Sequence, residues 1–124
     1  MPPAAKRGDK IFAMDVHSVK ASPSPIPTAM PFNGVLDNAL SPDVTIEGRA
    51  AATRGSTATN TPIHFSPTGF VVTPTNQGSV VGGSATVTIN GKAAARMGDS
   101  ALTCTEVPGN GPVVIATSTV AIGD

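Results

Sequence analysis

The chain has two histidines and one cysteine, and these three side chains are its candidates for binding a metal ion. His17 lies nine residues after Gly8, and His64 lies nine residues after Gly55, so both histidines follow a glycine at the same spacing. Cys104 supplies the thiol. Imidazole and thiolate are favoured ligands of Zn²⁺, and iron accepts the same donors. These residues therefore predict a structural zinc or iron site.

A structural zinc site normally has four ligands, and the sequence identifies only three. The candidates for the fourth are Asp15, Asp99, Glu106 and water. The alternative for each histidine is a hydrogen-bonded loop residue, and the alternative for Cys104 is a small buried hydrophobe. An enzyme with Cys104 as nucleophile and either histidine as base is a further alternative. No recognisable nucleophile motif surrounds the cysteine, so we expect no enzymatic activity.

The glycines that precede the histidines belong to a repeated unit. Val87–Asp99 predicts a β-hairpin, because alternating Val, Thr and Ile are followed by Asn90-Gly91, a pair that suits a type I′ turn. Val44–Ser56 matches this stretch at an offset of 43 residues, and Pro3–Asp9 is a degenerate third copy. An isolated hairpin is marginally stable in water, so the copies are expected to bury their apolar faces against one another.

Three copies arranged about an axis would bring the candidate ligands together. His17 and His64 occupy the same repeat position, and Cys104 follows Gly98 of the third copy by six residues. Much of the apolar fraction is alanine, which removes little area from water when it is buried. A small core of this kind is expected to need a staple, and a metal ion would provide one.

The composition favours short strands and turns. Gly and Pro together make up about a fifth of the chain, and no long stretch has a helical apolar stripe. We expect strands at Lys10–Val16, Phe70–Thr73 and Val113–Ile122, and a loop at Pro108–Pro112. Because alternating prolines are excluded from central strands, Ala21–Pro31 is expected to form an ordered surface strap. The predicted fold class is all-β with little or no helix.

Charge and length exclude several classes of function. The net charge is zero and the basic residues are not clustered, which argues against binding to nucleic acid. Ser56–Gly91 has no charged residue, but it is too rich in Thr, Ser, Asn, Gly and Pro to be a membrane span. Residues 1–20 lack the apolar run of a signal peptide, so synthesis in the cytoplasm is expected. We expect a single domain over residues 1–124.

Two of the copies resemble the Pro-Ala-Ala-Arg repeat, followed by Gly-Asp, that defines the PAAR family. They are Pro-Ala-Ala-Lys-Arg-Gly-Asp at Pro3–Asp9 and Ala-Ala-Ala-Arg-Met-Gly-Asp at Ala93–Asp99. The departures from the family pattern are Lys6 for Arg, Ala93 for Pro, Thr53 for Arg and Ser56 for Asp. Through its three repeats the resemblance covers nearly the whole chain.

The resemblance implies a small conical β-structure with approximate threefold symmetry. Such proteins cap the trimeric β-helical spike, a VgrG-like protein, of contractile injection machines: type VI secretion systems, extracellular contractile injection systems and contractile phage tails. One tip monomer would cap each trimer and sharpen it for puncture of an envelope. The family binds a metal ion, usually zinc, near the point, and that role falls on His17, His64 and Cys104. The sequence has one histidine fewer than the three-histidine, one-cysteine set of secretion-system members.

The resemblance also implies where the protein acts. The domain would have no effector extension, so any effector cargo would bind non-covalently, and contact with the target membrane would be transient. The tip would sit at the end of the injection particle and leave the producing cell when the machine fires. The alternative is a ligand-binding or adhesive β-domain at the tip of a fibre. That alternative predicts a chain that forms trimers by itself.

Overall fold

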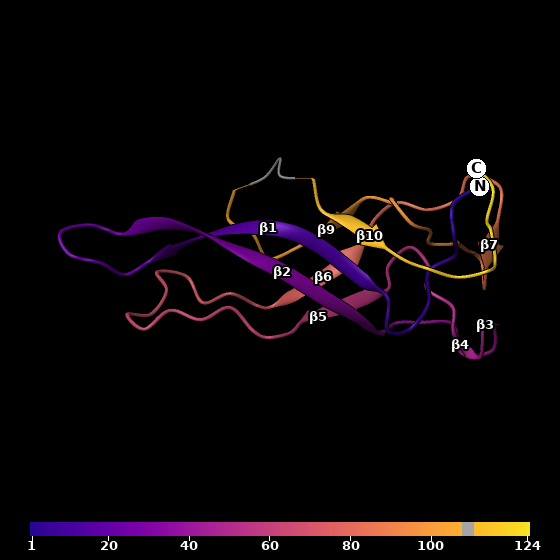
Figure 1. Cartoon of the computed structure of the whole chain (residues 1–124), viewed down its shortest axis with the longest axis horizontal. Helices are drawn as coiled ribbons and strands as arrows, with labels where there is room; N and C mark the ends of the chain where they lie inside the picture. Colours follow the sequence, from indigo (N-terminus) through magenta and orange to yellow (C-terminus); the bar gives the residue numbers. More distant parts are fainter. Residues whose placement is uncertain (108–110) are drawn as a thin grey trace.

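The computed structural model of the chain describes residues 1–107 and 111–124, and in them it is an all-β protein, as predicted (Figure 1). This part of the chain contains no helix that is long and apolar enough to cross a membrane. Residues 108–110 of the loop predicted at Pro108–Pro112 lie outside the described residues. The strands are β1 (Lys10–Val19), β2 (Ile26–Asn38), β3 (Thr45–Ile46), β4 (Arg49–Ala50), β5 (Thr57–Asn60), β6 (Gln77–Val80), β7 (Thr88–Ile89), β8 (Lys92–Ala93), β9 (Ala101–Leu102) and β10 (Val113–Ile115).

Six of these strands form one antiparallel sheet that nearly closes on itself. Its order is β10-β1-β2-β5-β6-β9. The two outer strands approach each other through a bridge between Ser100 and Val113, and the Ala101 amide donates to the Pro112 carbonyl at 3.0 Å. The sheet therefore consists of three outgoing and returning pairs, β1–β2, β5–β6 and β9–β10. The β1–β2 pair is the longest and extends to the end of the molecule opposite the two termini (Figure 1).

The three repeat copies close into a ring of backbone hydrogen bonds. The Ala5 amide donates to the Ala95 carbonyl at 3.0 Å, Ala95 donates to Ala52 at 3.1 Å, and Ala52 donates back to Ala5 at 3.0 Å. A second ring repeats the pattern around the same axis, with amides donating to carbonyls from Arg7 to Ala50, from Arg54 to Ala93 and from Met97 to Pro3. Within each ring the three bonds are related to one another by the repeat, so the predicted pseudo-threefold arrangement is confirmed. We call this part of the molecule, residues 3–9, 50–56 and 93–99, the ring.

Two short hairpins, β3–β4 and β7–β8, flank the ring. Their turns are Glu47-Gly48 and Asn90-Gly91, with φ of 52° and 79° in the first and 54° and 79° in the second. A type I′ turn requires positive φ at both central residues, and Gly and Asn adopt it at the lowest cost. The hairpin predicted around Asn90-Gly91 is confirmed.

Small side chains fill the space near the axis. One buried cluster at the ring combines three alanines with three isoleucines from equivalent positions: Ala4, Ala51, Ala94, Ile46, Ile89 and Ile122. The other cluster occupies the barrel and contains Phe32, which is fully buried. Phe32 needs glycine beside it, because a Cβ on Gly34 would lie 2.5 Å from its Cε1 atom and a Cβ on Gly78 would lie 3.1 Å from its Cζ atom. The barrel therefore has room for one large aromatic side chain at this level.

The surface strap predicted at Ala21–Pro31 is wrong, because β2 begins at Ile26 and its residues 26–35 pair with the whole of β1. Pro27 lies opposite Ser18, and Pro31 lies opposite Met14. On its other side, β2 pairs with β5 only from Gly34 onward. The proline-bearing half is thus an edge strand, where a missing amide proton removes no ladder hydrogen bond.

Two other predicted strands differ from the structure. Phe70–Thr73 forms no strand, and its contact with the sheet is a single bridge between Val19 and Phe70. The strand predicted over Val113–Ile122 ends at Ile115. A run of apolar residues marked the first segment and alternation of apolar and polar residues marked the second. Neither has a partner strand alongside it for the length predicted, and pairing is what forms a strand.

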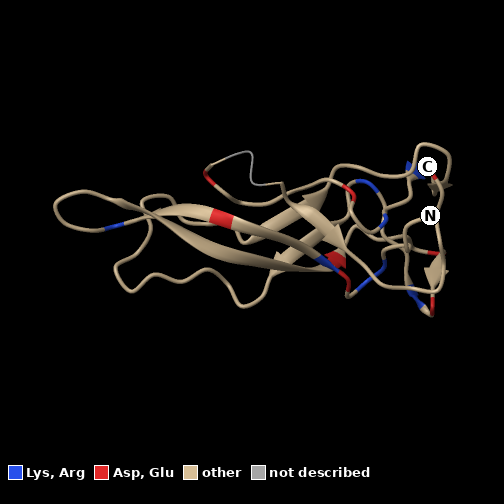
Figure 2. Ribbon diagram, turned by 45° about the horizontal axis from the view of Figure 1, so that its top comes forward, with Lys and Arg blue, Asp and Glu red and all other residues tan. Residues whose placement is uncertain are grey.

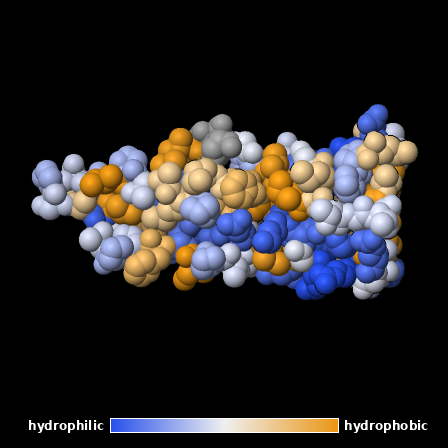
Figure 3. Space-filling view, in the orientation of Figure 1, coloured by the Kyte–Doolittle hydropathy of each residue, from blue (hydrophilic) through white to orange (hydrophobic). Residues whose placement is uncertain are grey.

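The two ends of the molecule differ in surface chemistry. Basic residues gather at the end that carries both termini, apart from Lys20 beyond the end of β1 (Figure 2). The segment between β5 and β6 has no charged residue and exposes Ile63, Phe65 and Val72. Figure 3 shows apolar patches over the half remote from the termini. We call the end with the termini the base and the opposite end the distal end.

Candidate metal centre

Four potential ligands meet inside the barrel on the distal side of the ring. They are Asp15, His17, His64 and Cys104, and one donor atom from each lies within 4.8 Å of the other three. Asp15 and His17 come from β1, His64 follows β5 and Cys104 follows β9. We call the first strand of each pair, together with the segment that follows it, a leg. Each of the three legs therefore contributes a donor, and the predicted convergence of the two imidazoles and the thiol is observed.

The distances between donor atoms suit a single ion. Oδ2 of Asp15 lies 3.0 Å from Nε2 of His64, 3.4 Å from Sγ of Cys104 and 3.7 Å from Nε2 of His17. Nε2 of His17 lies 3.6 Å from the same sulfur. Tetrahedral zinc with bonds of about 2.0–2.3 Å places its ligand atoms about 3.3–3.8 Å apart. The cluster could thus bind a metal ion after shifts of a few tenths of an ångström.

Burial of the Asp15 carboxylate within the cluster costs folding free energy unless a positive charge lies nearby. The exposed fractions are 0% for Asp15, 1% for His17 and 7% for His64, and Cys104 is partly buried. The Thr103 hydroxyl donates to Oδ1 of Asp15 at 2.6 Å, which leaves Oδ2 facing the imidazoles and the thiol. A buried carboxylate is expensive unless it is paired with positive charge or coordinates a metal. The donor set therefore fits a cation.

A network of asparagines positions His64. Its backbone amide donates to Oδ1 of Asn76 at 2.9 Å, and Nδ2 of Asn60 donates to the same oxygen at 3.1 Å. Oδ1 of Asn60 in turn accepts the Asn33 amide at 2.9 Å. The network connects β2, β5 and the segment before β6, so the position of His64 is tied to two strands of the barrel.

Burial raises the pKa of the Cys104 thiol, and the nearby Asp15 carboxylate raises it further against a hydrogen bond from the backbone of Asn76. A raised pKa keeps the thiol protonated at neutral pH, and its hydrogen faces Oδ2 of Asp15. A metal ion would displace this proton, because the thiolate is the ligand. The same shift disfavours Cys104 as a nucleophile.

The family model of the PAAR motif matches residues 72–124. The chain therefore carries a PAAR motif in its C-terminal part. The matched region contains the third ring copy, Ala93–Asp99, and Cys104, whereas both histidines lie before it. No curated protein matches the chain.

Asp15 is the member of the cluster that the sequence offered only as one of several candidates for the fourth ligand. The available signal was its spacing from His17, because side chains two apart on a strand point to the same face. Two other acids named as candidates lie elsewhere. Asp99 accepts from Arg96 in the ring at 2.8 Å, and Glu106 contacts Nδ1 of His17 from outside the cluster at 3.2 Å.

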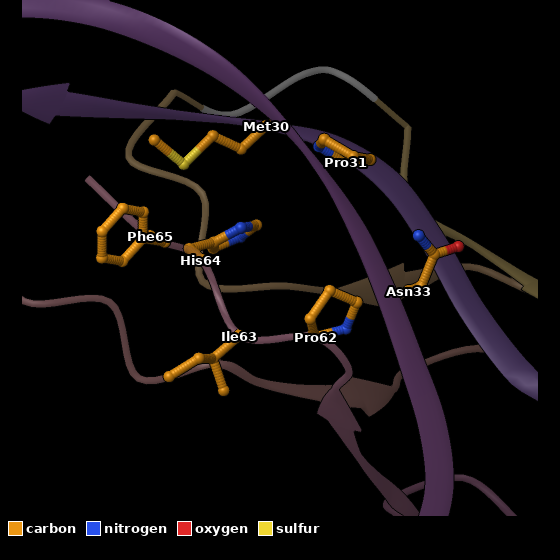
Figure 4. A pocket seen from close by; sticks show the side chains of 7 residues that line it. All are labelled: Met30, Pro31, Asn33, Pro62, Ile63, His64 and Phe65. Carbon is orange, nitrogen blue, oxygen red and sulfur yellow. The ribbon is translucent and has the colours of Figure 1, made fainter. Parts of the chain in front are cut away.

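Two cavities reach the cluster from outside. One of about 220 Å³ lies where Met30, Pro31 and Asn33 of β2 face residues 62–65, and His64 is part of its wall (Figure 4). The other, of about 170 Å³, lies between residues 72–75 and residues 104–106, and His17 belongs to its lining. Solvent can thus approach both imidazoles without passing through the ring.

Proposed function

We propose that this protein is the metal-stabilised tip that caps the trimeric β-helical spike of a contractile injection machine and sharpens it for puncture. The observation that carries the proposal is the ring. A single chain with three units bonded alike about one axis can match the symmetry of a trimer as one copy. The PAAR match over residues 72–124 supports the same role.

The base is the end that we propose for contact with the spike. Val44, Val87 and Val120 occupy equivalent places, since the carbonyl of each accepts an amide from a ring alanine: Ala51, Ala94 and Ala4 respectively. Val44 and Val120 are 37% and 41% exposed. Val87 is partly buried. Three equivalent apolar positions around one axis suit a trimer with an apolar end.

We propose that the ion is Zn²⁺ held by Asp15, His17, His64 and Cys104, with iron as the alternative. Two imidazoles, a thiolate and a carboxylate are within the range of ligands that zinc accepts in structural sites. The ion would supply a cross-link between the outgoing legs of the three units. At the distal end this link would replace the apolar burial that an interior of small residues cannot provide.

The remaining parts of the role are proposals of the same kind. The spike partner would be VgrG-like, the contact with the target membrane transient and any effector cargo bound non-covalently. The 124 residues would act as one tip domain without turnover of a substrate. The protein would be made in the cytoplasm and carried at the end of the injection particle.

The experiment mixes the purified protein with a trimeric β-helical spike protein and measures the mass of the complex by native mass spectrometry. The expected product is one chain per spike trimer. Val44→Asp at the base should reduce the yield of complex at least tenfold, because it introduces a charge at the proposed contact. Leu102→Asp is the matched control, since Leu102 is 59% exposed on the barrel.

The same measurement distinguishes the spike-tip function from the alternative, an adhesive β-domain at a fibre tip. That function predicts that the chain forms trimers by itself, whereas the spike-tip function predicts a monomer when the spike is absent. Self-trimerisation without binding to the spike would overturn the proposal. So would equal loss of binding in Val44→Asp and Leu102→Asp, because the contact would then not be at the base.

A further inference from the structure

Glu106 lies beside the cluster without belonging to it. Its Oε2 is 3.2 Å from Nδ1 of His17 and 3.3 Å from the backbone amide of Ser18, while its own amide donates to the Val16 carbonyl at 3.0 Å. The Glu106 side chain is 29% exposed, and the His17 side chain behind it is 1% exposed. The carboxylate therefore covers the outer edge of a buried imidazole.

The contact determines which nitrogen of His17 faces the cluster. An ionised carboxylate only accepts hydrogen bonds, so Nδ1 of His17 must be the donor. In the neutral ring the lone pair is then on Nε2, which is the atom near Asp15 and Cys104. A histidine that binds a metal commonly donates its second N–H to a carboxylate in this way, which fixes the ring and raises its basicity.

Three hydrogen bonds attach the segment that carries Glu106 to β1. The Thr105 hydroxyl accepts the Val16 amide at 2.9 Å, and the Thr103 hydroxyl donates to Asp15 at 2.6 Å. The Glu106 amide makes the third. Because these bonds hold the backbone, loss of the Glu106 side chain should leave the fold in place and remove only its contacts with His17 and with the Ser18 amide.

Glu106 also borders the cavity of about 170 Å³ between residues 72–75 and 104–106. Cys104 and His17 line the same cavity, so two of the four potential ligands are reached from it. A solvated ion that entered there would meet the Glu106 carboxylate before it met the buried imidazole.

We infer that Glu106 is a positioning residue for the metal ion: it orients His17 through Nδ1 and borders the route by which the ion enters and leaves. The inference rests on the metal site of the proposed function. It adds a requirement that the four ligands alone do not make, namely that a carboxylate outside the coordination shell determines how tightly the ion is retained.

The test compares Glu106→Ala and Glu106→Gln with the unchanged protein in three measurements. They are Zn²⁺ affinity by competition with a chromophoric chelator, the rate of zinc loss to excess chelator, and the melting temperature of the metal-free protein. Glu106→Ala should weaken affinity by about 10–100-fold, the usual effect of removing such a partner. Glu106→Gln should recover part of the loss, because its amide oxygen still accepts from Nδ1.

Glu47→Ala is the matched control. It removes the only other glutamate, which lies exposed at the base and accepts from Thr119, so the net charge changes equally. Affinity and release rate should remain those of the unchanged protein. The metal-free melting temperature of Glu106→Ala should change little, which separates positioning from a general loss of stability.

Two results would overturn the inference. One is equal zinc affinity in Glu106→Ala and Glu47→Ala. The other is a fall in metal-free melting temperature large enough to account for the whole loss of affinity. If the unchanged protein binds neither zinc nor iron, the metal site of the proposed function fails instead, and that outcome is seen before any variant is made.

Discussion

The ring and the cluster are held together by different means. In the ring, backbone amides and carbonyls of equivalent residues bond around the axis, and alanines fill the centre. In the cluster, four different side chains meet, two from one leg and one from each of the others. Backbone bonding requires only that the residues be small, so it repeats with the sequence. Side-chain ligation depends on which donor each leg supplies, so it departs from threefold symmetry.

Removal of a ligand should have the largest effect, and it should act on the distal end alone. The purified protein is expected to contain about one zinc or iron ion per chain. His17→Ala and His64→Ala should lower metal content and the melting temperature by about 10 °C or more, because each loses part of a cross-link. Elemental analysis and calorimetry measure both effects.

Hydrogen exchange would locate the damage in these variants. The amides of Ala5, Ala52 and Ala95 should stay protected in His64→Ala, since the ring has its own bonds. If ring protection falls as much as protection near the cluster, the two regions do not hold themselves together separately. A metal-free protein with unchanged stability would remove the ion from the account.

Overpacking the ring is the converse test. Ala52 is fully buried, and Ala52→Val places two more carbon atoms where the three copies meet. The free energy of unfolding should fall by about 1–3 kcal/mol. Zinc affinity of the folded protein should stay within about twofold, because the ligands come from the legs. Ala29→Val on the exposed part of β2 serves as the control and should be nearly neutral.

Asp15→Asn should separate a metal site from a structural ion pair by the sign of its effect. Asparagine keeps an oxygen for the Thr103 hydroxyl but removes a buried negative charge. Zinc affinity should fall at least about tenfold, whereas the metal-free protein should become more stable by about 1 kcal/mol. Denaturant titration with and without chelator measures both.

The exposed acid Asp43 provides the comparison for this variant, because Asp43→Asn removes the same charge from the base. Destabilisation of Asp15→Asn in the absence of metal would mean that the carboxylate pairs with the imidazoles for stability. The cluster would then be explained as a stabilising ion pair, and the cost of burying the Asp15 carboxylate would no longer argue for a metal ion.

The smallest expected effect lies at the base. Hydrogen bonds from the Thr119 hydroxyl and then its backbone amide lower the pKa of Glu47 below its usual value. A lowered folded-state pKa stabilises the protein at pH values above the usual one, and the gain is lost as pH falls through the lowered value. The stabilities of the unchanged protein and Glu47→Gln should therefore converge in acid, as the pH falls through the lowered pKa of Glu47. A difference that persists or grows in acid would contradict the assignment.

The ring could be predicted from the sequence because one unit is written three times. The Asn90-Gly91 pair predicted a hairpin turn, and the equal spacing of His17 and His64 after their glycines predicted that they share a repeat position. Asp15 could be named only as one of three acidic candidates for the fourth ligand, because its one distinguishing feature is its place two residues before His17. The proline-bearing half of β2 was mispredicted for another reason: which edge of a strand lacks a partner is a property of the whole sheet.

The ring has one further consequence. Its three units share their hydrogen bonding and their buried alanines and isoleucines, whereas the strands beyond them carry different side chains. A threefold receptor would therefore accept the protein in three rotations that look alike at the contact and differ farther from it. Particle images averaged with threefold symmetry would superimpose the legs of His17, His64 and Cys104 and blur all three. If the protein caps a spike trimer as proposed, each particle would hold it in one of the three orientations at random, and only a reconstruction without imposed symmetry would resolve them.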